Sequence, residues 1–279
     1  MTTKHLTKSI RAIHFLVLAF LMTLSSPVAA QDFQKGLTAA QAGDYATALQ
    51  EWTPLAEAGN EAAQHNLGQL YRQGQGVPQD YKEALKWYRL AAEQGDISAQ
   101  YNLASMYIRG MGVPQDYKEA VKWYRLAAEQ GSISAQFSLG VIYDTGEGVL
   151  QDYKEAVKWY RLAAEQGYVQ AQYNLGNSYS TGEGVLQDYK EAVKWYRLAA
   201  EQGYVQAQSN LAVMYERGNG ILQDNTMAHM WYNIASANGH EKAGGYRDGR
   251  AGLMTRADIS KAQAMARECM NSGYTKCGY

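Results

Sequence analysis

Tryptophan recurs along this chain at a nearly constant interval, and that period constrains the fold more than any other feature. The six tryptophans are Trp52, Trp87, Trp123, Trp159, Trp195 and Trp231, separated first by 35 residues and then four times by 36. The segment Asp80–Gly95 recurs at 116–131, 152–167 and 188–203, with Leu85 replaced by valine. A fixed period of this length is typical of solenoids, in which each supersecondary unit buries its apolar face against its neighbours.

The second half of each period carries the signals of a helix with defined ends. Asp80 can cap the first backbone N–H groups, and Glu83 can reach back to complete a capping box. Gly95 suits the left-handed conformation that ends many helices. An apolar stripe at helical spacing is formed by Ala84, Trp87, Tyr88 and Ala91. We therefore predict an amphipathic helix here in every period.

The first half of each period predicts another helix, packed closely on a neighbour. Ala63, Leu67 and Tyr71 share one face at helical spacing. The residue after each leucine of this column is small: Gly68, Ala104, Gly140, Gly176 and Ala212. We expect a neighbouring helix to approach closely there. Between the two helices, Gly74 and Gly76 favour a tight, ordered loop with positive φ.

The repeated residues resemble the Sel1-like repeat, a relative of the tetratricopeptide repeat with a longer loop between its helices. The residues that carry the resemblance are Leu67–Gly68–x–x–Tyr71, Gly74–x–Gly76–Val77, Asp80, Ala84, Trp87–Tyr88, Ala91–Ala92 and Gly95. This pattern recurs five times in register. The resemblance implies an all-α fold, a right-handed αα-superhelix, or solenoid, of Sel1-like and tetratricopeptide-like helix pairs.

The repeats divide the chain after residue 30 into three predicted parts. Residues 60–239 form five repeats of 36 residues. Residues 31–59 contain Trp52 but no Gly-x-Gly loop, which indicates an N-terminal capping helix pair. Residues 240–279 lose the period and are predicted to form C-terminal capping helices, since terminal repeats of solenoids are commonly atypical.

Residues 1–30 have the three parts of a secretory signal peptide. Lys4, Lys8 and Arg11 precede an apolar run at 12–24, and small residues stand before a predicted cleavage ahead of Gln31. The alternative is a membrane anchor, but this run is shorter than the roughly 20 residues that a helix needs to span a bilayer. We expect an exported product without a membrane span after cleavage, most readily periplasmic, with secretion as the alternative.

Cys269 and Cys277 are the only cysteines of the chain. They lie eight residues apart in a chain expected to reach an oxidising compartment, which favours a structural disulfide across a short loop. A redox-active pair is the alternative, although the spacing is not Cys-x-x-Cys. We therefore expect the pair to close the C-terminal cap.

Charge and motif content argue against nucleic-acid binding and against catalysis. From Gln31 onward the chain holds 23 basic residues (26 − 3) against 27 acidic ones, whereas phosphate binding needs clustered Lys and Arg. The histidines His65, His229 and His240 lack metal-ligand spacing, and His65 is interpreted as exposed. There is no Gly-x-Ser-x-Gly motif and no Ser-x-x-Lys motif after the signal. We predict no metal, no cofactor and no catalytic residue.

The repeats vary mainly in three columns of the first helix, which lie nearly opposite the Ala63–Leu67–Tyr71 stripe. The columns hold His65, Gln69 and Arg72; Tyr101, Ser105 and Ile108; Phe137, Val141 and Asp144; Tyr173, Asn177 and Ser180; and Ser209, Val213 and Glu216. In the tetratricopeptide family the equivalent face lines the concave groove, and the resemblance implies the same here. Aromatic residues on such a face are typical of protein or peptide sites. Neutral drift on a solvated face is the other interpretation.

Three functions follow from these observations. The leading hypothesis is a non-catalytic adaptor of the bacterial cell envelope that binds a protein or peptide along the concave groove. The second is a β-lactamase-like or other cell-wall hydrolytic enzyme, because a cysteine-rich branch of the family is described in that way. Those proteins pair a disulfide with each repeat, unlike this chain. The third is a module that binds peptidoglycan or another glycan.

Overall fold

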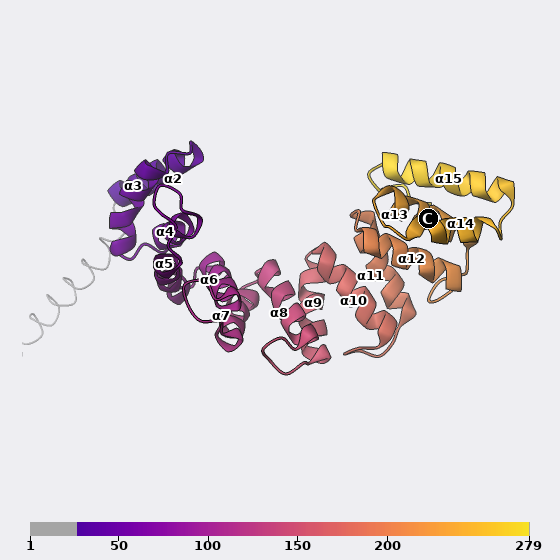
Figure 1. Ribbon diagram of the computed structural model, residues 1–279, viewed down its shortest axis with the longest axis horizontal. Helices are drawn as coiled ribbons and strands as arrows, with labels where there is room; N and C mark the ends of the chain where they lie inside the picture. The colour runs from indigo at the N-terminus through magenta and orange to yellow at the C-terminus, as the bar shows by residue number, and fades with distance from the viewer. Residues whose placement is uncertain (1–26, 279) are drawn as a thin grey trace, which may run out of the picture. The chain divides into compact units, whose positions relative to one another are not determined.

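The computed structural model describes the backbone of residues 27–278 and the side chains from residue 32 onward. The predicted signal peptide at 1–30 lies outside the described residues apart from its last turn. Within the described range every regular element is a helix, and no strand is present (Figure 1). The all-α helical-repeat prediction is therefore confirmed. No helix in that range combines the length and apolar character that a membrane span requires.

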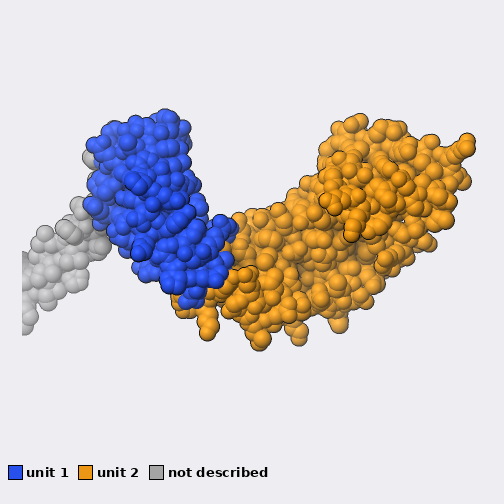
Figure 2. Space-filling view, viewed as in Figure 1, with its two compact units in different colours: residues 1–116 blue, residues 117–279 orange. Residues whose placement is uncertain are grey.

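The chain divides into two compact units, which are coloured separately in Figure 2. Unit 1 runs to Asp116 and unit 2 begins at Tyr117. The helices of unit 1 are α2 (Pro27–Gln41), α3 (Tyr45–Glu57), α4 (Glu61–Gln73), α5 (Tyr81–Gln94) and α6 (Ile97–Arg109). The repeat helices of unit 2 are α7 (Tyr117–Glu129), α8 (Ile133–Thr145), α9 (Tyr153–Glu165), α10 (Val169–Thr181), α11 (Tyr189–Glu201), α12 (Val205–Arg217) and α13 (Asn225–Ala237). Two further helices of unit 2, α14 (Ala243–Ala251) and α15 (Arg256–Asn271), both pack against α13.

Successive helices pack against one another in both units, as helix pairs stacked in a solenoid require. Within unit 1, α4 packs on α5 and α5 on α6; within unit 2 the same order continues from α8 to α13. The buried stripe is the predicted one. In the second helix of a pair, Ala84, Trp87, Tyr88 and Ala91 are all buried. In the first helix Ala63 and Leu67 are buried and Tyr71 is half-buried.

The predicted capping box forms only in part. The Asp80 carboxylate accepts hydrogen bonds from the backbone N–H groups of Lys82 at 2.9 Å and Glu83 at 3.1 Å. The backbone N–H of Asp80 donates to the carbonyl of Tyr71 at 2.9 Å, so the donor that Glu83 would satisfy is already paired. Glu83 instead forms an ion pair with Lys86 at 2.7 Å. The same aspartate cap starts later helices at Asp152, Asp188 and Asp224.

The small residues after the leucines do admit a close helix approach. A Cβ atom added to Gly68 would lie 2.7 Å from Cδ1 of Tyr88, and one added to Gly176 would lie 2.7 Å from Cδ1 of Tyr196. Each glycine therefore seats the tyrosine ring of the following helix flat against the backbone. This contact fixes how the two helices of a repeat meet.

Each unit contains a ladder of buried glutamines, which was not predicted from the sequence. The glutamine amide groups donate to the carbonyl groups of Ala56, Ala92, Ala128, Ala164 and Ala200 from Gln64, Gln100, Gln136, Gln172 and Gln208, at 3.0 to 3.2 Å. A side-chain amide at the end of the second helix of the same repeat donates to that glutamine, as Gln202 does to Gln172 at 2.8 Å. Such bonds satisfy buried polar groups and connect one helix pair to the next.

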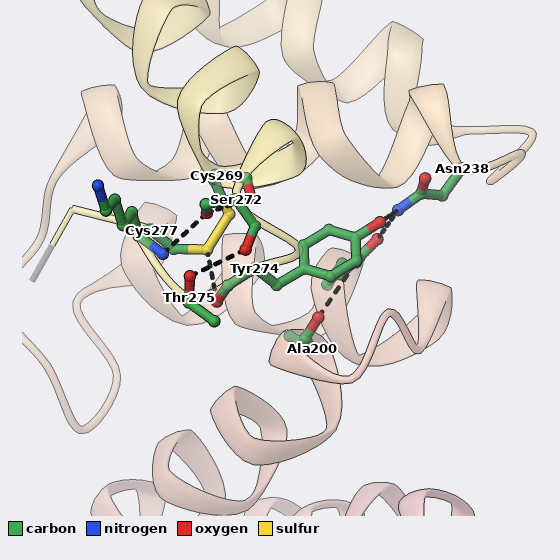
Figure 3. The surroundings of a disulfide bond; sticks show 9 residues. Ala200, Asn238, Cys269, Ser272, Tyr274, Thr275 and Cys277 are labelled. Carbon is green, nitrogen blue, oxygen red and sulfur yellow. Dashed lines mark hydrogen bonds between the residues drawn. A yellow bond between two sulfur atoms is a disulfide. The ribbon is translucent and has the colours of Figure 1, made fainter.

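After the last repeat, the predicted disulfide joins Cys269 and Cys277 (Figure 3). Both cysteines are buried. The loop between them holds Tyr274 at φ 67°, and its ring points toward Asn238 (Figure 3). Asn238 donates to the Tyr274 hydroxyl at 2.8 Å and to Oε1 of Gln208 at 2.9 Å. The disulfide loop therefore supplies the last partner of the glutamine ladder.

Candidate partner-binding face

The three variable columns of the first helices, here called the variable face, lie on α4 and α6 in unit 1 and on α8, α10 and α12 in unit 2. All fifteen predicted residues are half-buried except Gln69, which is exposed, and Ser209, which is buried. They are thus not a fully solvated surface. In four of the five repeats, one of these residues forms a hydrogen bond with the tyrosine of the following helix.

The hydroxyl group of that tyrosine meets a different partner in different repeats. Arg72 Nε donates to Tyr88 at 3.3 Å, whereas Tyr160 donates to Asp144 at 3.1 Å. The remaining two bonds run from Tyr196 to Asn177 at 2.8 Å and from Tyr232 to Glu216 at 2.6 Å. The tyrosine at this position of the repeat is constant, but its hydroxyl forms a hydrogen bond with a guanidinium group, a carboxylate or an amide, depending on the repeat. From the sequence it was interpreted only as part of the buried stripe, because a helical period does not show where a hydroxyl at the end of a ring points.

Aromatic rings of the variable face pack on the same tyrosines. The ring centroids of Phe137 and Tyr160 are 6.0 Å apart, and those of Tyr173 and Tyr196 are 6.1 Å apart. In unit 1 the ring of His65 takes this place, 5.7 Å from that of Tyr88. A tyrosine at this position is thus covered by an aromatic ring in units 1 and 2 alike.

The interpretation of His65 as an exposed side chain is wrong. Its ring is half-buried against Tyr88, and its Nε2 lies 3.3 Å from Nδ2 of Asn102. Burial lowers the pKa of His65 below the ordinary 6.5, because desolvation penalises the charged form. The Asn102 amide nitrogen can only donate, so Nε2 must accept this hydrogen bond, which requires a neutral His65 ring.

Two further tyrosines, not singled out from the sequence, extend the aromatic part of the face in unit 2. Tyr168 and Tyr204 stand at the N-cap positions of α10 and α12 but form no side-chain cap, whereas Asn60, Asp96 and Ser132 cap their helices. Instead, the two rings lie 4.9 Å from Phe137 and 5.1 Å from Tyr173, respectively. The signal was present in the sequence as a change of residue type at one position of the repeat.

The charges of the face differ along the chain. In unit 1, Arg72 supplies a cation, and in unit 2, Asp144 and Glu216 supply carboxylates. Burial raises the pKa of Asp144 above its ordinary 3.8, because desolvation makes the charged carboxylate less favourable. Glu216 is stabilised by an ion pair with Arg250 Nη2 at 2.7 Å, as well as by Tyr232. Burial also raises the pKa of Tyr196 to about 12, so this phenol remains a neutral donor at physiological pH.

A recess in unit 1 adjoins the exposed end of the face. It has a volume of about 290 Å³, and its walls include Gln69 and Asn66 of α4 together with Trp52 and Tyr45 of α3. The recess is therefore lined by both aromatic rings and amide groups. No group of three or more His, Cys, Asp or Glu residues in the described part of the chain is placed to hold a metal ion.

Stacked helix pairs with a constant second helix and a variable first helix define an αα-solenoid protein. The chain belongs to the Sel1 repeat family, whose family model matches it at residues 61–96, 97–132, 133–168, 169–204 and 205–240. The five repeats expected from the tryptophan period are thus confirmed.

Solved structures of bacterial proteins share this architecture. A protective antigen present in uropathogenic Escherichia coli strains, which displays an SLR fold, is 37% identical, with a TM-score of 0.77 over 88% of this chain and 54% of the antigen. This chain therefore spans about half the length of that antigen. A Sel1 repeat protein from Oxalobacter formigenes is 39% identical, with a TM-score of 0.71 over 76% of this chain and 87% of that protein. No curated protein matches this chain.

Proposed function

We propose that this chain is a non-catalytic scaffold of the bacterial cell envelope that binds an extended segment of a partner protein along the variable face. The observation that carries the proposal is the tyrosine hydroxyl that meets Arg72, Asp144, Asn177 and Glu216 in different repeats. The second helix of each repeat is nearly constant in sequence. The first helix presents a different polar or aromatic side chain in each repeat. In a repeat array of this kind, successive repeats can bind successive parts of an extended partner.

The chemistry of the face favours a particular kind of segment. In unit 2, half-buried rings at Phe137 and Tyr173 alternate with the polar groups of Asp144, Asn177 and Glu216. Rings in such positions supply apolar contact area, while the carboxylates and the amide accept hydrogen bonds. A partner segment that alternates apolar side chains with basic or amide side chains would satisfy both. The raised pKa of Asp144 supports this, since a cation would favour its charged form.

The cell-envelope part of the proposal rests on the sequence of residues 1–30 and on the disulfide. The Cys269–Cys277 bond is compatible with an oxidising compartment, where structural disulfides persist. Cell fractionation followed by N-terminal sequencing tests it: we expect the periplasmic fraction to contain a chain that begins at Gln31. Exported material that still begins at Met1 would contradict the cleavage.

The binding part is tested by crosslinking in living cells with a photoreactive residue at Ser180, on the variable face, and at Leu162, a half-exposed position on α9. We expect a discrete crosslinked partner from Ser180 and none from Leu162. Phe137→Glu and Tyr173→Glu should abolish that crosslink, while Leu162→Glu should keep it. Circular dichroism shows whether each variant remains helical. A partner that survives both face substitutions in a folded chain would rule the face out.

The non-catalytic part has its own test, because the enzymatic alternative names a substrate class. Purified chain incubated with the chromogenic β-lactam nitrocefin is expected to give no hydrolysis above buffer. Turnover that scales with chain concentration would replace the scaffold proposal with the hydrolase alternative.

Glycan binding is a second candidate, favoured by the ring pairs Phe137–Tyr168 and Tyr173–Tyr204. Half-exposed aromatic rings can stack on sugar faces. Co-sedimentation with isolated peptidoglycan sacculi separates this candidate from the scaffold: binding that Tyr168→Ala and Tyr204→Ala abolish would favour the glycan module.

A further inference from the structure

Three leucines of unit 2 are almost entirely exposed to solvent. Leu150, Leu186 and Leu222 are 90%, 91% and 88% exposed. They occupy the same position of the repeat, in the loops that join α8 to α9, α10 to α11 and α12 to α13. The first two of these loops lie along the lower margin of unit 2 in Figure 1. We call these three residues the leucine row.

The loops hold the leucines outward in a fixed way. The residue after each leucine is a glutamine whose amide donates to a backbone carbonyl of the preceding helix, as Gln151 does to Asp144 at 2.6 Å and Gln187 to Ser180 at 2.8 Å. Gln223 does the same to Glu216 at 2.8 Å. The aspartate that follows caps the next helix. The exposure of the leucines is therefore a property of an ordered loop, and they are preorganised for contact.

The fold does not need leucine at this position. In unit 1 the corresponding residues are Pro78 and Pro114, yet Gln79 donates to the Arg72 carbonyl at 2.8 Å and Gln115 to the Ile108 carbonyl at 2.7 Å, as in unit 2. The loop thus keeps its contacts with either residue. An apolar side chain exposed three times in register is a feature that packing within the unit does not explain.

Acidic residues flank the leucine row. Between the first glycine and the capping aspartate of the three loops the acidic residues are Glu147, Asp152, Glu183, Asp188 and Asp224. The same segments, 146–152, 182–188 and 218–224, contain no Lys or Arg. Glu147 and Glu183 stand where unit 1 has Gln75 and Met111, so two of the three leucine loops gain an acid, while the third has Asn219.

We propose that the leucine row is a second interaction surface, distinct from the variable face, which docks a basic amphipathic helix of another protein. The apolar stripe of such a helix would cover the leucines, and its lysines or arginines would face the flanking acids. Charge complementarity selects this occupant. A second copy of the chain would bring acidic loops against each other, and an anionic membrane surface would repel them.

The test uses a synthetic amphipathic helical peptide of leucine and lysine, with a leucine and glutamate peptide of the same pattern as its counterpart. Both are titrated calorimetrically into the full chain. We expect the lysine peptide to bind and the glutamate peptide not to bind. The triple variant Leu150→Ser, Leu186→Ser, Leu222→Ser should weaken binding about ten-fold or more. Leu253→Ser, at another leucine that is 68% exposed, is the matched control and should bind as wild type.

The charged part of the surface has a separate variant. Glu147→Gln with Glu183→Gln should weaken the lysine peptide and flatten the salt dependence of its affinity. Phe137→Glu should leave the peptide bound, which distinguishes this surface from the variable face.

Several results would overturn the proposal. Among them are no binding of the lysine peptide, equal binding by the triple variant, and equal binding of the glutamate peptide. Sedimentation showing a wild-type dimer that the triple variant loses would assign the row to a second copy. Co-sedimentation with phosphatidylethanolamine and phosphatidylglycerol vesicles that requires the leucines would assign it to a membrane.

Discussion

The hydroxyl of Tyr196 donates a hydrogen bond to Oδ1 of Asn177 at 2.8 Å, joining the constant helix α11 to the variable helix α10. The same oxygen accepts from Nδ2 of Asn210 on α12 at 3.3 Å. One amide oxygen on the variable face thus ties three successive helices together. The variable face therefore takes part in stabilising the solenoid.

This relationship predicts that Tyr196 and Asn177 are energetically coupled. Tyr196→Phe and Asn177→Ala should each lower the free energy of unfolding by about 1 kcal/mol, because each breaks a half-buried hydrogen bond. The double variant should lose less than the sum of the two, with a coupling of about 0.5–1 kcal/mol or more. Urea unfolding of the four proteins measures the cycle. Strict additivity would show that the bond does not contribute.

The close approach at Gly176 predicts a second effect on stability. Gly176→Ala would place a Cβ 2.7 Å from the Tyr196 ring, so the ring or the helix must shift. We expect a loss of about 1–3 kcal/mol, the usual cost of overpacking. The matched control is Gly245→Ala on α14, where a Cβ meets nothing within 4 Å. There the better helix propensity of alanine should leave stability unchanged or raise it by up to about 1 kcal/mol. Equal effects at both sites would contradict the packing argument.

Residues that act within one helix, and the small residues where helices approach closely, could be predicted from the sequence, whereas side-chain hydrogen bonds between helices could not. The aspartate caps, the glycine stops and the buried Ala–Trp–Tyr–Ala stripe follow from local spacing, and the family resemblance added the helix-pair architecture. The glutamine ladder is different, because Gln172 is an unremarkable polar residue until the carbonyl of Ala164 and the amide of Gln202 lie beside it. The incomplete capping box has the same origin, since a carbonyl from the preceding helix takes the donor that Glu83 would have satisfied.

The variable face illustrates the same limit. Comparison of the repeats identified which positions change, but spacing along one helix does not reveal that several of them contact the tyrosine of the next helix. Tyr168 and Tyr204 were overlooked because they lie before the helix, at positions where a capping residue was the natural expectation. What these residues bind stays a prediction.

Burial of Asp144 predicts a pH-dependent effect. Its folded pKa is raised above the ordinary 3.8, so the folded state binds more protons than the unfolded state between these values. The charged carboxylate therefore reduces stability at pH 7, and this penalty disappears as the pH falls below about 3.8. Asp144→Asn, which can still accept the Tyr160 hydroxyl, should be more stable than wild type at pH 7 and should lose that advantage near pH 3.

The measurement is urea unfolding of both proteins at the two pH values. Comparing the difference between variant and wild type cancels the titration of all other groups. Glu165→Gln, at an exposed carboxylate on α9, is the control and should show little difference at either pH. An advantage of Asp144→Asn that grows toward acid pH would contradict the burial argument.

The Cys269–Cys277 bond predicts local as well as global effects, because its loop carries Tyr274. Replacement of both cysteines by alanine should lower the free energy of unfolding by about 2–3 kcal/mol, the loop-entropy value for a short ring. The Tyr274 backbone N–H donates to the Cys269 carbonyl at 2.8 Å, and its hydroxyl accepts from Asn238. Without the bond, we expect hydrogen exchange to become faster at Tyr274 and in α15 while α4 and α5 of unit 1 keep their protection. Lys276→Ala, an exposed change in the same loop, should alter neither quantity. Unchanged exchange at Tyr274 in the cysteine variant would show that the loop is held by packing alone, and that the glutamine ladder ends without help from the disulfide.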